Sequence, residues 1–205
     1  MPAYSYHTLK GPSQGIYKEK GSKFLAFAYP VSSEMEIKER IETLRKEYFD
    51  ARHHCFAWML GLDKDKFRSF DDGEPNHSAG DPILGQIRSK GITDVLVVVV
   101  RYFGGVKLGV GGLISAYKAA AEEVLNNAEI VEKEVTEILD ISFDYEITSD
   151  IMRMVKDFDL KIIEQSFGDA GRIKGYIALR QKEKLLIKID FMRAMGKNMV
   201  WKIES

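Results

Sequence analysis

The most constraining feature of this sequence is an apolar strand that runs directly into a glycine-rich loop. Val95 to Phe103 is β-branched and apolar apart from Arg101, a pattern typical of a strand buried on both faces. The loop that follows, residues 104–112, reads GGVKLGVGG. Apolar residues then recur at helical spacing from Leu113 and predict a helix ending near Asn126.

Local patterns also predict the other elements of the first half. They are a strand over Gly15–Val31 with a turn at Lys18–Lys23, a helix after the capping box Ser33/Glu36, a hairpin of Cys55–Leu62 with Phe67–Phe70, and a short helix from Asp81 to Gly91. The acidic, polar stretch Glu129–Glu134 is predicted to link two domains, residues 1–132 and 133–205.

The second half follows a βαββαβ order, which is the ferredoxin-like arrangement. The expected elements are strand Val135–Tyr145, helix Ser149–Phe158, strands Lys161–Phe167 and Arg172–Leu179, helix Lys182–Met195 and strand Met199–Ile203. The last helix competes with a strand pattern, because Leu185, Ile187, Ile189 and Phe191 alternate.

Composition excludes several classes of protein. With 205 residues, 45% of them apolar, the chain can build a real core, and a formal net charge of −1 shows no chain-wide basic excess for nucleic acid. The longest apolar run, Val95–Val100, is far short of a membrane helix, so we expect a cytoplasmic protein that does not enter a membrane. The single cysteine, Cys55, forms neither an internal disulfide nor a thiolate metal cage.

Charge is nevertheless polarised near the end of the chain. Residues 172–202 hold nine basic and two acidic groups. This excess predicts a salt-sensitive contact with a polyanion, and a solvated face of an ordinary domain is the alternative. The lysines proposed for a nucleic-acid contact are Lys174, Lys182, Lys184, Lys188, Lys197 and Lys202.

The glycine-rich loop is a candidate anion site. Glycines let backbone N–H groups approach a ligand, the following helix adds partial positive charge, and Arg101 and Lys107 add full charges. The segment matches neither a P-loop nor a dinucleotide fingerprint. A tight turn with close helix packing explains the same glycines equally well.

Two further clusters have a structural and a chemical interpretation. Asp71, Asp72 and Glu74 could hold Mg²⁺ or act in acid–base chemistry, but Asp-Gly-Glu-Pro is also turn chemistry, which we favour. His53 and His54 would face opposite sides of a strand, so we expect no shared metal ion. A thiolate at Cys55 lacks an identifiable partner, and packing is its simpler role.

Together these motifs resemble the IMPACT family, including its YigZ-type bacterial members. The matching stretches are EKGSKFLAFA (19–28), ARHHCFAW (51–58), DDGEP with AGDPIL (71–84) and VVVVRYFGGVKLGVGGLISAY (97–117). The resemblance implies a ribosomal protein S5 domain 2-like first domain, and a second domain like the last domain of elongation factor G, a pairing associated with translation. His77, Ser78, Val100 and Ser115 depart from the family pattern.

We therefore expect a two-domain α+β protein that binds RNA or a ribosome-associated protein, rather than an enzyme, with no cofactor, no metal and no DNA sequence specificity. The alternative is a Mg²⁺-dependent enzyme acting on a phosphorylated small molecule or nucleotide. Control of a translation kinase, known for eukaryotic relatives with an extra N-terminal domain, is not transferred. The expected surface comprises Lys20, Lys23, His53, Asp71, Asp72, Glu74, Arg101, Tyr102 and Lys107, with Gly104, Gly105, Gly109, Gly111 and Gly112 shaping the loop.

Overall fold

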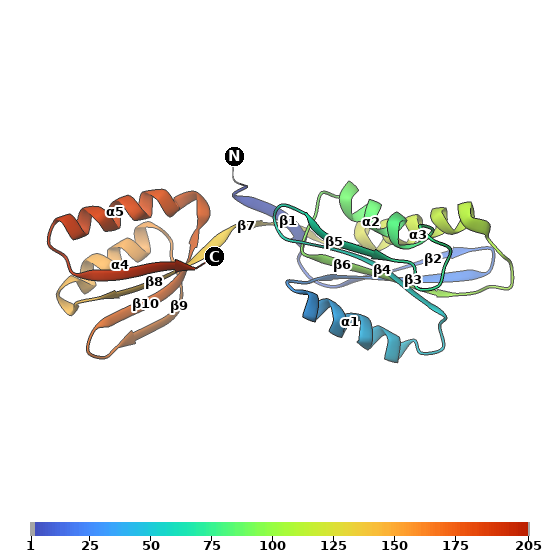
Figure 1. Ribbon diagram of the computed structural model, residues 1–205, viewed down its shortest axis with the longest axis horizontal. Helices are drawn as coiled ribbons and strands as arrows, with labels where there is room; N and C mark the ends of the chain where they lie inside the picture. Colours follow the sequence, from blue (N-terminus) through green and yellow to red (C-terminus); the bar gives the residue numbers. More distant parts are fainter. Residues whose placement is uncertain (1–2, 205) are drawn as a thin grey trace. The chain divides into compact units, whose positions relative to one another are not determined.

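The computed structural model describes residues 3–204, which divide into two compact units of mixed α/β structure (Figure 1). One unit comprises residues 6–133 and the other comprises residues 3–5 with 134–204. The expected linker is instead strand β7 (Ile130–Glu134), which pairs with β1 (Ser5–Leu9). Neither strand was predicted, because both are short and their pairing joins segments more than a hundred residues apart.

The main sheet of the first unit is antiparallel and has the strand order β2-β3-β6-β4-β5. Their bounds are β2 (Ser13–Glu19), β3 (Ser22–Pro30), β4 (His53–Leu60), β5 (Lys66–Phe70) and β6 (Val95–Tyr102). The hairpin predicted between β4 and β5 is confirmed by their register, in which Trp58 pairs with Arg68. The central strand β6 is the apolar run that the sequence placed in a buried position.

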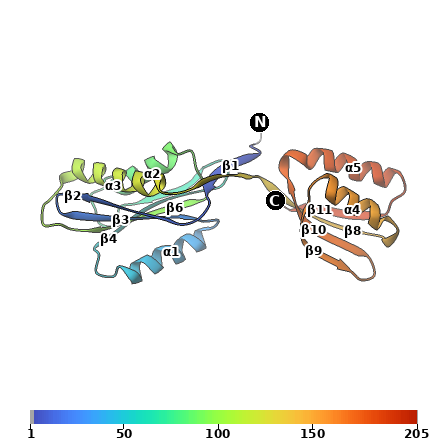
Figure 2. The same cartoon turned by 180° about the vertical axis from the view of Figure 1, so that it is seen from behind.

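Helices cover both faces of this sheet (Figure 1 and Figure 2). Helix α1 (Glu34–Glu47) lies on one face, and α2 (Gly80–Ser89) and α3 (Gly109–Asn126) lie on the other. Alternate residues of β6 therefore enter two different cores. Val95, Val97 and Val99 pack beneath α2 and α3, while Leu96, Val98 and Val100 pack beneath α1. The prediction of a strand buried on both faces is confirmed.

Helix α3 begins four residues earlier than predicted. It starts at Gly109 rather than at Leu113, so three of the five loop glycines lie in its first turn. Gly105 and Gly109 have φ values of +88° and +72°, a conformation that glycine adopts without strain. The helix was predicted from the spacing of its apolar residues, and the first of these to reach the core is Leu113. The predicted start was therefore too far along the chain.

The second unit has the βαββαβ element order that the sequence predicted. Its strands form the antiparallel order β11-β8-β10-β9. The elements are β8 (Thr136–Phe143), α4 (Thr148–Asp157), β9 (Lys161–Phe167), β10 (Gly171–Ala178), α5 (Lys182–Ala194) and β11 (Met199–Glu204), with short 3-10 turns η1 (Tyr145–Ile147) and η2 (Leu179–Gln181). Segment 182–194 is a helix, since Leu185, Ile189 and Met192 enter the core at helical spacing while Ile187 stays exposed.

Between residues 3 and 204, no helix combines the length and the apolar character needed to cross a membrane.

The two units have separate hydrophobic cores. The two cores of the first unit are built from residues between Leu9 and Leu125, and a third core belongs to the second unit.

This separation of cores leads to a prediction about independent folding. A fragment of residues 1–134 retains the whole of β7 and both cores of the first unit, so it should unfold in one cooperative urea transition followed by circular dichroism. An insoluble fragment, or one that unfolds without a cooperative transition, would show that its stability depends on the rest of the chain.

Candidate functional site

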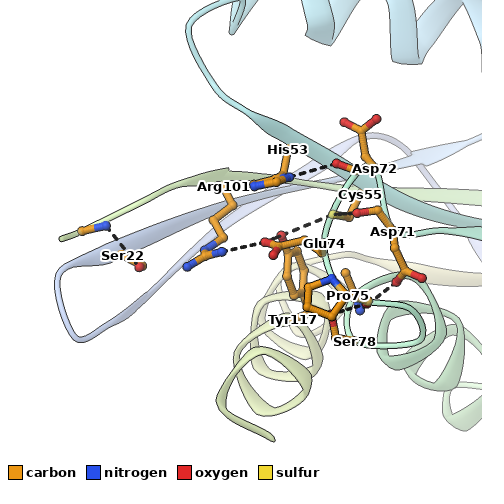
Figure 3. Close-up of polar contacts among 12 residues, drawn as sticks. Ser22, His53, Cys55, Asp71, Asp72, Glu74, Pro75, Ser78, Arg101 and Tyr117 are labelled. Atoms are coloured by element: carbon orange, nitrogen blue, oxygen red, sulfur yellow. Dashed lines mark hydrogen bonds and ion pairs between the residues drawn. The ribbon is translucent and has the colours of Figure 1, made fainter. Parts of the chain in front are cut away.

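Arg101 and Glu74 form a buried ion pair (Figure 3). Arg101, near the end of β6, donates from Nη1 to Glu74 Oε1 at 2.7 Å, and only 8% and 4% of the two side chains are exposed. The Tyr117 hydroxyl of α3 donates to the same oxygen at 2.7 Å. Arg101 and Glu74, both expected at the surface, are therefore mainly internal partners, and they join the turn between β5 and α2 to the sheet and to α3.

Cys55 continues this network as a thiol. Its Sγ donates to the Asp71 carbonyl oxygen at 3.0 Å and lies 3.3 Å from the Tyr117 hydroxyl oxygen. Burial raises the pKa of Cys55 well above its ordinary value, and burial likewise raises the pKa of Tyr117. Cys55 thus stays protonated at neutral pH, which removes the thiolate interpretation and supports the packing role.

The Asp71 carboxylate holds the start of α2. Its Oδ1 accepts from the N–H groups of Ala79 at 3.0 Å and Gly80 at 2.8 Å, and its Oδ2 accepts from the His77 N–H at 2.8 Å. These bonds satisfy backbone donors that a helix start leaves without partners. Asp71 is therefore a helix-capping residue. The interpretation of this segment as a turn favoured a structural role of this kind.

Asp72 serves a second structural purpose. It accepts from Arg45 Nη2 at 2.9 Å and from the His54 N–H at 2.7 Å, joining α1 to β4. The carboxylates of Asp71, Asp72 and Glu74 thus face different partners, and no cluster of three metal-ligating side chains occurs within the described residues. These three carboxylates, which the alternative function would use for Mg²⁺, are thus bonded separately within the protein.

The two adjacent histidines occupy different environments, as their alternation along a strand predicted. His53 Nδ1 lies 2.9 Å from the Asp72 carbonyl oxygen (Figure 3). His54 is 5% exposed, and burial lowers its pKa, which favours the neutral ring.

The loop glycines divide into two groups. Gly104 packs directly against the β2–β3 turn, and a Cβ atom built on it would lie 1.9 Å from the carbonyl carbon of Gly21. Gly104 is therefore required for close packing. By contrast, a Cβ on Gly105, Gly109 or Gly111 would meet nothing within 4 Å among the described residues.

Part of the expected surface gathers around one pocket of about 420 Å³ at the start of α3. Five expected residues line it, namely His53, Glu74, Arg101, Lys107 and Gly109. The lining residues that the sequence analysis missed are Arg52, Pro75, Phe103, Leu108, Val110 and Leu113. Phe103 had a usable signal, because it is an aromatic residue at the point where the buried strand enters the loop.

Positive charge dominates this pocket. Arg52, Arg101 and Lys107 are basic, and the only acidic residue in the lining, Glu74, is already bonded to Arg101 and Tyr117. Helix α3 begins there with no side-chain cap and no acidic residue in its described first turn. Its free N–H groups add about half a positive charge at the same place. The pocket is thus suited to an anionic ligand.

The remaining expected residues do not line the pocket. Lys20 and Lys23 are exposed on the β2–β3 hairpin, and Asp71 and Asp72 form the structural bonds described above. Tyr102 donates to Asp50 Oδ1 at 2.7 Å, and this bond raises the pKa of Tyr102 to about 12. Their place in the expected surface therefore stays a prediction.

Most of the lysines proposed for a nucleic-acid contact form ion pairs within the second unit. Lys182 pairs with Glu137 at 2.7 Å and Lys174 with Glu204 at 3.2 Å. Lys197 pairs with Asp150, and Lys202 pairs with Glu204. Lys184 and Lys188 have no ion pair within the described part of the chain, so a polyanion contact there stays a prediction. The count over residues 172–202 missed this pairing, because the partners Glu137, Asp150 and Glu204 lie outside that range in the sequence.

The four departures from the family pattern have local explanations. His77, at φ +64°, has its Nδ1 2.6 Å from Asp81 Oδ2, and Ser78 bonds the Pro75 carbonyl oxygen within the turn. Val100 is a core residue, and Ser115 Oγ donates to the Gly111 carbonyl oxygen on the exposed side of α3. None of the four lines the pocket.

Comparison with known proteins gives consistent matches. The family model described as the Impact N-terminal domain matches residues 20–125. The IMPACT family member YvyE of Bacillus subtilis is 32% identical over 85% of this chain and 80% of its own, and YigZ of Escherichia coli is 33% identical over 76% and 78%. A crystal structure of a hypothetical protein, 27% identical, superposes with a TM-score of 0.74 and covers 100% of this chain and 98% of its own.

Proposed function

The chain belongs to the IMPACT family, and from that premise we propose that it is a non-enzymatic RNA-binding protein that acts with the translation machinery in the cytoplasm. The observation that carries this proposal is the pocket at the start of α3. It combines three basic side chains, a helix N-terminus and the exposed aromatic ring of Phe103. Basic side chains and a helix N-terminus bind phosphate groups, and an aromatic ring stacks on a nucleic-acid base.

The fold assignments are part of the same proposal. We assign the five-stranded unit to the ribosomal protein S5 domain 2-like fold that the family resemblance implies. The strand order β11-β8-β10-β9 with βαββαβ connections supports a ferredoxin-like assignment, like the last domain of elongation factor G, for the second unit. Both assignments agree with a role beside RNA, although a fold alone does not determine a function.

Binding rather than catalysis fits the polar groups of the site. Asp71 caps α2, Asp72 holds α1 and β4, Glu74 neutralises Arg101, and Cys55 is a buried thiol. The groups that could hold Mg²⁺ or attack a substrate are thus committed to internal bonds. The exposed Lys107 and the neighbouring Arg52 supply charge for recognition without a reaction step.

The proposal predicts a salt-dependent RNA affinity that relies on the pocket. Arg52→Ala and Lys107→Ala should each weaken binding of a fluorescent RNA in an anisotropy titration, and should each reduce the slope of log affinity against log salt by about 1. The melting temperature should barely change, because an exposed lysine contributes little to stability.

Lys118→Ala is the matched control, because Lys118 is exposed on α3 and outside the pocket. It should leave affinity and salt slope unchanged. If the two pocket variants bind RNA with the affinity and slope of the parent protein, the pocket is not the RNA contact. If the protein binds a ribosomal protein and not RNA, the RNA-binding proposal is wrong and the partner is a protein.

A further inference from the structure

We propose that the pocket at the start of α3 holds one unstacked nucleotide of single-stranded RNA. This inference rests on the proposed RNA-binding function and narrows its ligand from RNA in general to a nucleotide whose base is free of a helix. The mixed apolar and basic lining of the pocket, the buried guanidinium of Arg101 and the hydrogen-bonded ring of His53 carry it.

The size of the pocket favours a single nucleotide. Its volume is about 420 Å³, within the range of small-molecule sites, and it lies between the loop, the start of α3 and the beginning of β4. A concave site of this size admits one extruded base with its phosphate. In an intact A-form duplex the bases stay stacked and paired, so none of them can enter the pocket. A duplex would therefore contact only the rim of the pocket.

The lining of the pocket combines the two kinds of chemistry that a nucleotide has. Its apolar residues are Phe103, Leu108, Val110 and Leu113. Phe103 is 56% exposed and Val110 is 53% exposed, so both offer apolar surface to a ligand. Its basic residues are Arg52, Arg101 and Lys107. A base against Phe103 and a phosphate against the basic side chains would use both kinds of residue at once.

Arg101 is the group that points to an anionic ligand independently of the helix start. Its side chain is more than nine-tenths buried, and its guanidinium lies 5.6 Å from the ring centre of Phe24 and 5.8 Å from that of Phe103. Glu74 accepts from Nη1, yet Nε has no hydrogen-bond partner in the described part of the chain. Because Nε is itself buried, a phosphate in the pocket would meet the Nη groups, and Glu74 accepts only from Nη1.

His53 adds a group that can select for ribose or base donors. A carbonyl oxygen only accepts hydrogen bonds, so the contact of Nδ1 with the Asp72 carbonyl oxygen places the ring hydrogen on Nδ1. In the neutral ring, Nε2 is then an acceptor. Since His53 lines the pocket, this nitrogen can accept from a ribose 2′-OH or from an N–H of a base.

The experiment compares four probes with the full-length protein: a short single-stranded RNA, a blunt RNA duplex of the same composition, adenosine monophosphate and inorganic phosphate. Single-stranded RNA should bind at least about tenfold more tightly than the duplex, and adenosine monophosphate should displace it at lower concentration than phosphate does. Phe103→Ala should weaken single-stranded binding by about 5- to 150-fold, the usual worth of one base–aromatic stack, and leave duplex binding nearly unchanged.

Phe49→Ala is the matched control, because Phe49 is 83% exposed and lies outside the pocket. It should bind like the parent, and unchanged melting temperatures would show that both variants fold. The nucleotide pocket is overturned if the protein binds single-stranded and duplex RNA with equal affinity, or if Phe103→Ala binds single-stranded RNA like the parent. The proposed function still stands in that case if RNA binding depends on Lys107. Absence of RNA binding even at low salt overturns both.

Discussion

Replacing Gly104 with alanine should cost the first unit more than about 3 kcal/mol of unfolding free energy, the upper range for overpacking a close contact. The new Cβ would lie 1.9 Å from the Gly21 carbonyl carbon and 2.1 Å from the Ser22 nitrogen. Both are backbone atoms, so no side-chain rotation relieves the collision. The β2–β3 hairpin and the loop would have to separate, which also breaks the Gly104 N–H bond to Ser22 Oγ.

Gly111→Ala is the matched control for this substitution. Gly111 lies in the first turn of α3, and among the described atoms a Cβ there would meet nothing within 4 Å. Alanine should stabilise the helix by about 0.5–1 kcal/mol relative to glycine. Urea unfolding followed by circular dichroism measures both changes. A Gly104→Ala protein with the parent midpoint would show that the close approach at this turn is not needed for the fold.

The second large effect should come from the buried pair of Glu74 and Arg101. Glu74→Ala leaves the Arg101 charge in an interior where its side chain is 8% exposed, and also removes the acceptor of the Tyr117 hydroxyl. Removing one partner of a buried ion pair costs about 3–5 kcal/mol, because the other charge is left without compensation. We expect the urea midpoint to fall accordingly, with little change in the slope of the transition.

Two comparisons make this result specific. The double variant Glu74→Leu with Arg101→Leu removes both charges and should recover much of the loss. Glu129→Ala breaks the Lys10–Glu129 pair, which has a similar separation of 2.9 Å but side chains 63% and 64% exposed, and should cost no more than about 1 kcal/mol. If Glu74→Ala costs no more than Glu129→Ala, the buried pair contributes nothing beyond an exposed one.

Residue periodicity was sufficient for elements whose side chains enter a core at regular intervals. The alternation of β6 into two cores and the amphipathic spacing of α4 were visible in the sequence, because local geometry alone relates neighbouring side chains. The same logic misplaced the start of α3, since glycines carry no apolar signal. It also missed β1 and β7, whose pairing depends on contacts between distant segments.

The candidate site was predictable in location but less so in the roles of its residues. The segments around Asp71, Arg101 and Lys107 were identified from unusual residue types close together in sequence. Which of them face a ligand was not visible there. Asp71 turned out to cap α2 and Glu74 to neutralise Arg101, whereas Lys107 lines the pocket. A carboxylate has the same sequence signature in a cap, an ion pair or a metal site.

The family, the mixed α/β class, most helices and strands, and the position of the glycine-rich loop before α3 were predictable from residue patterns. Three features became visible only in the folded chain: Gly104 is a packing residue, Arg52 and Phe103 join Lys107 around one pocket, and most of the lysines proposed for a nucleic-acid contact are paired with acidic residues. Separation along the chain explains this difference. Secondary structure follows from side chains a few residues apart, whereas charge compensation and ligand pockets arise between segments that meet only when the sheets have formed.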